Sequence, residues 1–199
     1  MATHSWYKSF AELRTSESER SSYSVTTMNR GSVFAIVAPH GGGIEPGTSE
    51  IAKGIAGAVF SYYTFDGLMQ EGNELLHITS TLFDEPKCLD LINHSDAVVA
   101  IHGCGGDEKN IIVGGLFDRL KIRLINSMVT AGFDASLAEA SYTGSQIQNI
   151  CNRGRLGQGV QLEISAGLRR AGLEKQLSFL PAETMPQTNS GLAPAGGRP

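Results

Sequence analysis

The chain has 199 residues, 41% of them hydrophobic and 18% charged, so it is long enough to bury a core and is unlike a disordered protein. Sixteen basic and twenty acidic residues give a formal net charge of −4, which argues against nucleic acid as a partner. No stretch approaches the ~20 apolar residues of a membrane span, and residues 1–20 lack the pattern of a secretion signal. The three cysteines have no CxxC spacing, which favours neither a disulfide scaffold nor a thiolate zinc site. We therefore expect synthesis in the cytoplasm and no membrane partner.

The N-terminal third contains one sharp pattern. Residues 6–13 have the spacing of a short amphipathic helix, and the Ser/Thr-rich residues 15–27 are compatible with a loop and a polar strand. The continuous apolar run at 33–38 then predicts a strand buried on both faces of a parallel sheet. A glycine-rich loop follows it, and helical spacing of apolar residues predicts a helix over 46–59.

The remainder repeats this alternation of strands and helices. Further strands are predicted at 58–66, 75–80, 97–101, 133–137 and 159–165, and further helices at 86–93 and 116–132. Interleaved strands and helices predict an α/β fold with an open, mixed, mostly parallel sheet sandwiched by helices. We expect one catalytic domain over 1–182 and a flexible tail over 183–199, which is rich in Pro, Gly and Ser.

Three polar residues follow two of the predicted buried strands. His40 and Glu45 come after the strand at 33–38, and His102 comes after the strand at 97–101. The carboxyl ends of parallel strands meet at one edge of a sheet, where α/β proteins form their sites. Two imidazoles and a carboxylate form one of the known ligand sets of catalytic zinc. The sequence therefore indicates a candidate Zn²⁺ site, although a single histidine after a strand is more often a structural, hydrogen-bonded group.

Other reactive residues have weaker support. His77 falls within a predicted strand and His94 near a helix end, so both are expected to be structural. Cys104 lies only two residues from His102, which is poorly placed for a thiol nucleophile and its base. The run HGGG at 40–43 is similar to the oxyanion loop of lipases, but no GxSxG nucleophile motif occurs. We assign no role to His77 or Cys104.

Glu163 lies in the middle of an alternating strand pattern. Val160, Leu162 and Ile164 point to one face and Glu163 to the other. An ionised carboxylate in an apolar layer must be paired or change its protonation state. Two interpretations stay open: a solvent-facing position on an edge strand, or a general base aimed into the site.

Polar and basic residues surround Glu163 in the sequence. Four arginines and this one acid give residues 151–170 a formal charge of +3. Guanidinium groups bind carboxylates through paired hydrogen bonds, so the segment suggests an anionic substrate. The candidate substrate-binding residues are Asn152, Arg153, Arg155 and Arg169.

Four separated motifs carry a resemblance to a known family. They are APHGGGIEPGT at 38–48, LHITS at 76–80, IHG at 101–103 and GVQLEIS at 159–165. Over residues 30–172 the chain resembles the poly-γ-glutamate hydrolases of bacilli and their phages. This resemblance implies a zinc hydrolase with a core similar to that of metallocarboxypeptidases, in which His40, Glu45 and His102 hold the metal and Glu163 is the general base.

The resemblance also implies a substrate and a setting. We expect cleavage of γ-glutamyl amide bonds in poly-γ-glutamate by a monomer that acts outside the cell after host lysis. Because affinity for a polyanion would then depend on the +3 segment in a protein of net charge −4, we expect turnover to weaken as ionic strength rises. The alternative in the same chemistry is a zinc amidase or carboxypeptidase acting on a small N-acyl or peptide substrate. A non-catalytic module that binds sugars or polyanions is the alternative from another class.

Overall fold

A computed structural model describes residues 7–172, and the expected domain end at 182 and tail at 183–199 lie outside the described residues. The strands are β1 (Tyr23–Met28), β2 (Phe34–Gly42), β3 (Ser61–Gly67), β4 (Ala97–Cys104), β5 (Asn110–Gly114), β6 (Asp134–Leu137) and β7 (Val160–Ser165). The α-helices are α1 (Phe10–Ser16), α2 (Thr48–Ala56), α3 (Pro86–Asn93), α4 (Asp118–Thr130) and α5 (Ala166–Arg170), and two 3₁₀ turns are η1 (Asn73–Leu76) and η2 (Ile150–Asn152). Within residues 7–172, no helix has the length and hydrophobicity to cross a bilayer.

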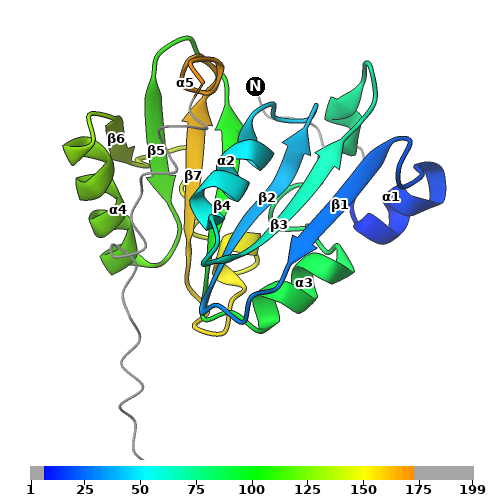
Figure 1. The fold of residues 1–199 in the computed structure, drawn as a ribbon, viewed down its shortest axis with the longest axis horizontal. Coiled ribbons are helices and arrows are strands. Elements are labelled where there is room, and N and C mark those ends of the chain that lie inside the picture. Colours follow the sequence, from blue (N-terminus) through cyan, green and yellow to red (C-terminus); the bar gives the residue numbers. More distant parts are fainter. Residues whose placement is uncertain (1–6, 173–199) are drawn as a thin grey trace, which may run out of the picture.

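The strands form one mixed sheet in the order β1-β3-β2-β4-β7-β5-β6. The central strands β3, β2, β4 and β7 are parallel, whereas β1 and β5 run antiparallel to their neighbours β3 and β7. The carboxyl ends of β2, β4 and β7 therefore meet at one edge of the sheet, at the top of Figure 1. The predicted α/β class with a mixed, mostly parallel sheet is confirmed.

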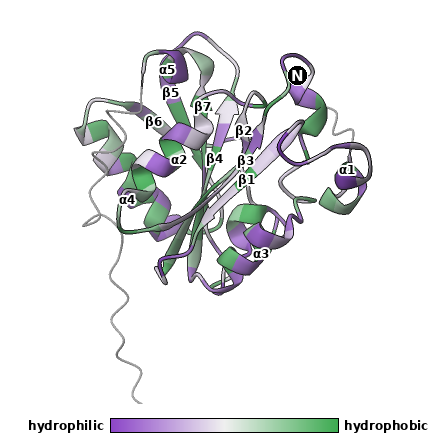
Figure 2. Ribbon diagram, turned by 45° about the vertical axis from the view of Figure 1, so that its right-hand side comes forward, coloured by the Kyte–Doolittle hydropathy of each residue, from purple (hydrophilic) through white to green (hydrophobic). Residues whose placement is uncertain are grey.

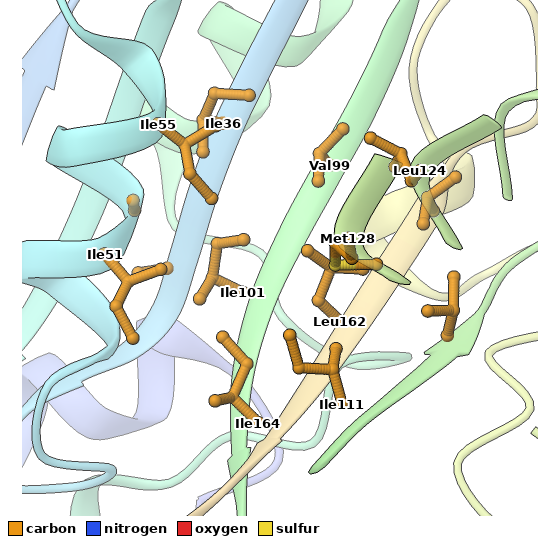
Figure 3. Packing of buried hydrophobic residues seen from close by; sticks show 14 of the residues in the cluster. Ile36, Ile51, Ile55, Val99, Ile101, Ile111, Leu124, Met128, Leu162 and Ile164 are labelled. Atoms are coloured by element: carbon orange, nitrogen blue, oxygen red, sulfur yellow. The ribbon is translucent and has the colours of Figure 1, made fainter. Parts of the chain in front are cut away.

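Hydrophobic cores cover both faces of the sheet. Alternate residues of β2 point to opposite faces of the sheet. Ile36 packs with α2 and α4 on one face, and Val37 packs with α1 and α3 on the other. Figure 3 shows Ile51 and Ile55 of α2 against the first of these faces. Polar and apolar residues mix along α2 and α3 in Figure 2, as expected of helices that cover a sheet with one side only.

Several predicted elements differ from the observed ones. The strand predicted at 75–80 is wrong, because η1 and an irregular stretch occupy this region after Gly72, which adopts a φ of 80°. The strand predicted from residue 58 begins at Ser61, since a turn at Gly57 ends α2 first. Strand β2 is longer than predicted: its pairing with β3 continues through Gly42 after an irregularity between Ala38 and Gly41. Strand β5 was not predicted at all.

Candidate active site

Three of the candidate residues lie on one face at the carboxyl edge of the sheet. Register places His102 of β4 directly beside Glu163 of β7, and both side chains point away from the face that α2 covers. His40 lies near the end of β2, beyond the point where the pairing shifts. Glu45 comes from the loop between β2 and α2, where its backbone N–H donates to the His40 carbonyl at 2.9 Å. Sequence-distant residues therefore converge.

The ligand atoms of His40, Glu45 and His102 have the spacing of a metal site. His40 Nδ1 lies 3.3 Å from Glu45 Oε1 and 3.2 Å from His102 Nδ1, and His102 Nδ1 lies 3.8 Å from Glu45 Oε2. Tetrahedral coordination with ligand bonds of ~2.0–2.1 Å separates ligand atoms by ~3.3–3.4 Å. These three residues fit a zinc ion.

Contacts behind the ligand atoms orient them. His40 Nε2 donates to the Ile78 carbonyl at 2.7 Å, and because a carbonyl can only accept, Nε2 carries a proton and Nδ1 is the nitrogen that faces Glu45 and His102. The Gly103 backbone N–H donates to Glu45 Oε2 at 2.8 Å, and the Ser80 hydroxyl lies 3.4 Å from His102 Nε2. Such second contacts fix ligand tautomers and orientations in known metal sites.

His77 also belongs to this site, although its sequence position within a predicted strand indicated a structural residue. It follows η1, and its ring stacks on that of His40 with 3.8 Å between the ring centres. Its Nε2 lies 3.8 Å from Glu45 Oε1, and the ligand atoms of His40, Glu45 and His77 all lie within 4.8 Å of one another. His77 and His102 therefore compete for the third ligand position. Both rings lie 3.8 Å from a Glu45 oxygen, and the separation of 3.2 Å between His102 Nδ1 and His40 Nδ1 favours His102.

Burial and neighbouring charges set the protonation states of the ligands. Burial opposes ionisation of both His40 and Glu45, but their attraction outweighs it, so the pKa of His40 is raised and that of Glu45 falls to about 2. Burial lowers the pKa of His102 to about 4 and that of His77 to about 3. Near neutral pH Glu45 is therefore ionised and His77 and His102 are neutral, which are the forms that bind a metal.

Glu163 is buried on an inner strand. Strand β7 lies between β4 and β5, and the residue is only 7% exposed, so the interpretation of a solvent-facing edge position is wrong. Burial, and then the nearby charge of Glu45, raise the pKa of Glu163 to about 8. A carboxylate with such a pKa can both accept and release a proton near neutral pH.

These residues line a cleft of about 690 Å³. Two segments of irregular chain form parts of its lining, Thr79–Thr81 and Tyr142–Gln146. The complete lining is His40, Glu45, His77, Thr79, Ser80, Thr81, His102, Gly103, Cys104, Gly105, Tyr142, Thr143, Gly144, Ser145, Gln146, Asn149, Gln161 and Glu163. Among these lining residues there is no arginine or lysine.

Arg169 is the one predicted substrate-binding residue near the ligands. It lines a smaller hollow of about 180 Å³ together with Glu45 and His77. Its guanidinium donates to the carbonyls of Ile164 at 3.0 Å, Pro46 at 2.6 Å and Cys104 at 3.1 Å. The side chain therefore braces β7, the loop after β2 and the end of β4.

The structure places Arg153 and Arg155, two of the predicted substrate-binding residues, outside the cleft lining. Arg155 pairs with Asp96 at 2.6 Å, next to the first residue of β4 and so at the opposite end of that strand from His102. Arg153 donates to the Phe83 carbonyl at 2.8 Å, and neither arginine lines the cleft. The basic segment is thus divided between the two ends of β7.

Asn152 lies behind the cleft, and Cys104 lies in its wall. The buried Asn152 amide donates to the carbonyls of Gly144 and Gln146 at 2.6 and 2.9 Å, which anchors the loop that lines the cleft. Asn152 therefore acts behind the cleft and does not line it. Cys104 lies in the cleft wall, but burial raises the pKa of its thiol and disfavours the nucleophilic thiolate.

Two histidines and a carboxylate at the carboxyl edge of an α/β sheet, with a second buried carboxylate beside them, form a site of the kind found in metal-dependent hydrolases. Residues 7–183 match the poly-γ-glutamate hydrolase family, and the chain belongs to this family. The resemblance seen in the four sequence motifs is thus confirmed.

Relatives occur in Bacillus subtilis (strain 168). The chain is 44% identical over 167 residues to the SPbeta prophage-derived UPF0714 protein YoqZ, and the matched region covers 82% of this chain and 60% of YoqZ. It is 39% identical over 168 residues to the UPF0714 protein YndL, and the matched region covers 83% of this chain and 66% of YndL. The chain therefore spans somewhat less than two thirds of the length of these two relatives.

Two solved structures share the fold at substantial identity. A bacteriophage poly-gamma-glutamate hydrolase superposes with a TM-score of 0.82 and 35% identity, covering 84% of this chain and 82% of that chain. YndL in its zinc-free apo form superposes with a TM-score of 0.80 and 38% identity, covering 84% and 83%.

Proposed function

We propose that this protein is a zinc-dependent hydrolase that cleaves the γ-glutamyl amide bonds of poly-γ-glutamate. The observation that carries the proposal is the convergence of His40, Glu45 and His102 beside a buried Glu163, in a chain of the poly-γ-glutamate hydrolase family. The zinc-free description of the related YndL structure supports zinc as the metal. Without a metal, the attraction between His40 and Glu45 raises the pKa of His40 and lowers that of Glu45 at the position where a cation fits.

His40, Glu45 and His102 would hold the ion, with His77 beside them. When bound at such a site, zinc supplies a Lewis acid that polarises a carbonyl group and lowers the pKa of a water molecule. Glu163 accepts a proton from the water that attacks the amide carbonyl and delivers it to the leaving amine. In the metal-free protein its pKa is raised to about 8, so burial makes this carboxylate a stronger base than an exposed glutamate.

The cleft favours a polymer over a small substrate. Ser145 and Gln146 in its lining are exposed, so a chain can enter without a closed pocket forming around it. Because no arginine lines the cleft, the substrate carboxylates meet hydroxyl groups such as those of Thr79, Ser80 and Thr81. A phage-derived monomer released by host lysis fits this activity, and the prophage origin of YoqZ supports that setting.

The test uses high-molecular-weight poly-γ-glutamate, with chain length followed by size-exclusion chromatography. We expect cleavage that stops on chelation and returns with Zn²⁺, and bound zinc that is lost in His102→Ala but kept in His94→Ala, which changes an exposed histidine on α3's C-terminal cap. Glu163→Gln should retain zinc and lose almost all cleavage.

Absent or chelator-insensitive cleavage would refute the proposal, and cleavage of only small N-acyl or peptide substrates would favour the amidase alternative. Binding of the polymer without cleavage, unaffected by Glu163→Gln, would indicate the non-catalytic module.

A further inference from the structure

Gln161 is a buried amide beside the candidate general base. It is 4% exposed and lies two residues before Glu163 on β7, so both side chains are on the same face of the sheet. Its register partners on the two adjacent strands, Ala100 and Gly114, are small. They leave room above β7 for the Gln161 side chain and for the chain segment that packs on it.

The hydrogen bonds of Gln161 use both ends of its amide. Its Oε1 accepts from Asn149 Nδ2 at 2.9 Å, and its Nε2 donates to the Tyr142 carbonyl at 2.9 Å and to Glu163 Oε1 at 3.1 Å. Asn149 is itself oriented, since its Oδ1 accepts from the Cys151 backbone N–H at 3.1 Å. The network therefore determines which end of the Gln161 amide faces Glu163, and both Nε2 hydrogens are engaged.

The same amide holds the loop that lines the cleft. Gly144, with a φ of 57°, packs directly against the Gln161 side chain, and a Cβ there would lie 2.7 Å from Gln161 Cδ. Tyr142 has a φ of 60°, which is unfavourable for a tyrosine and persists only where surrounding contacts impose it. The hydrogen bond from Gln161 to the Tyr142 carbonyl is such a contact.

We propose that Gln161 is a positioning residue whose amide holds the Glu163 carboxylate and the Tyr142–Gln146 loop in one fixed arrangement. This inference rests on the function proposed above. Gln161 holds Oε1 of Glu163, so Oε2 is the oxygen that exchanges the proton with water and the leaving amine. The donated hydrogen bond also favours the ionised form of Glu163, which is the form that accepts a proton.

Gln161→Met tests the proposal, because methionine has a similar shape and cannot make these hydrogen bonds. We expect kcat on poly-γ-glutamate to fall by about 10- to 100-fold, the factor that a hydrogen bond to a charged group contributes. KM and bound zinc should stay within twofold of the wild-type values. The acid limb of the kcat profile should move to higher pH, since an ionised Glu163 has lost a donor. The matched control, Gln148→Met, changes an exposed glutamine outside the cleft lining and should retain wild-type values.

A purely structural role would lower kcat and zinc content and raise KM without moving the acid limb, and this result would overturn the proposal. An unchanged kcat in Gln161→Met would do the same. If Gln161→Met does not fold, Gln161→Glu replaces the donor by a second carboxyl group of the same shape, and the acid limb should move further to higher pH. An unmoved limb in that variant refutes the inference.

A further measurement separates this inference from the proposed function. Chymotrypsin cleavage after Tyr142 in the full-length, metal-free protein reports how firmly the loop is held and needs no catalysis. We expect Gln161→Met to be cleaved at least about tenfold faster than Gln148→Met. If wild-type protein fails to cleave the polymer, the proposed function fails, whereas equal proteolysis of the two variants overturns the positioning role.

Discussion

The raised pKa of Glu163 makes the stability of the metal-free protein depend on pH. Below its ordinary pKa of 4.5 the carboxyl group is protonated in both the folded and the unfolded chain. Between 4.5 and about 8 the folded protein binds a proton that the unfolded chain has released, so the free energy of unfolding falls as pH rises. Above about 8 both forms are ionised, and the stabilisation by the protonated group is lost.

The size of this effect follows from about 1.4 kcal/mol per pKa unit. Between pH 5 and pH 8 the loss has an upper limit of about 4 kcal/mol, and hydration of the cleft reduces it to a few kcal/mol. Urea denaturation of metal-free wild type and Glu163→Gln at several pH values measures it. The histidines and Glu45 titrate in both proteins, so the difference between the two curves reports Glu163 together with its coupling to His40 and Glu45. Curves that stay parallel from pH 5 to pH 9 would refute the reasoning.

Further predictions concern the ligands, the arginines and the charge of the cleft. Zinc titrations should show that His77→Ala lowers the affinity for zinc by about 10- to 100-fold, the range for residues that orient a metal site from outside the ligand set. His102→Ala should lower this affinity further. The reverse order would make His77 the third ligand. In chemical denaturation, Arg169→Ala should lower the free energy of unfolding by about 3 kcal/mol, because three carbonyls lose a charged donor. Arg155→Ala should lower the free energy of unfolding by less than about 1 kcal/mol and leave KM unchanged, since the ion pair of Arg155 with Asp96 is away from the cleft. A raised KM would support a role of Arg155 in substrate binding. Initial rates from 20 to 200 mM salt should stay level or rise modestly, which is opposite to the sequence-based expectation. The cleft lining has no arginine, and salt screens the repulsion between a protein of net charge −4 and a polyanion. A steep fall in rate would show that arginine contacts dominate binding.

Local patterns in the sequence were sufficient for the central strands and for much of the candidate site. The apolar runs that become β2 and β4 can only be buried, and the polar residues His40 and His102 near their carboxyl ends must then meet at one sheet edge. The alternation in β7 likewise determined that Glu163 points away from the core formed by Leu162 and Ile164. These conclusions need only the side-chain period of a strand and the direction of parallel neighbours.

Only the tertiary structure decided which other residues belong to the cleft. Arg155 and Arg169 are close in sequence, but the six residues of β7 lie between them and extend about 20 Å, so they fall at opposite ends of the sheet. His77 comes from an irregular segment whose path depends on contacts such as that between Ile78 and His40. Sequence distance predicts position along a strand, whereas the packing of irregular chain depends on partners that no local pattern specifies.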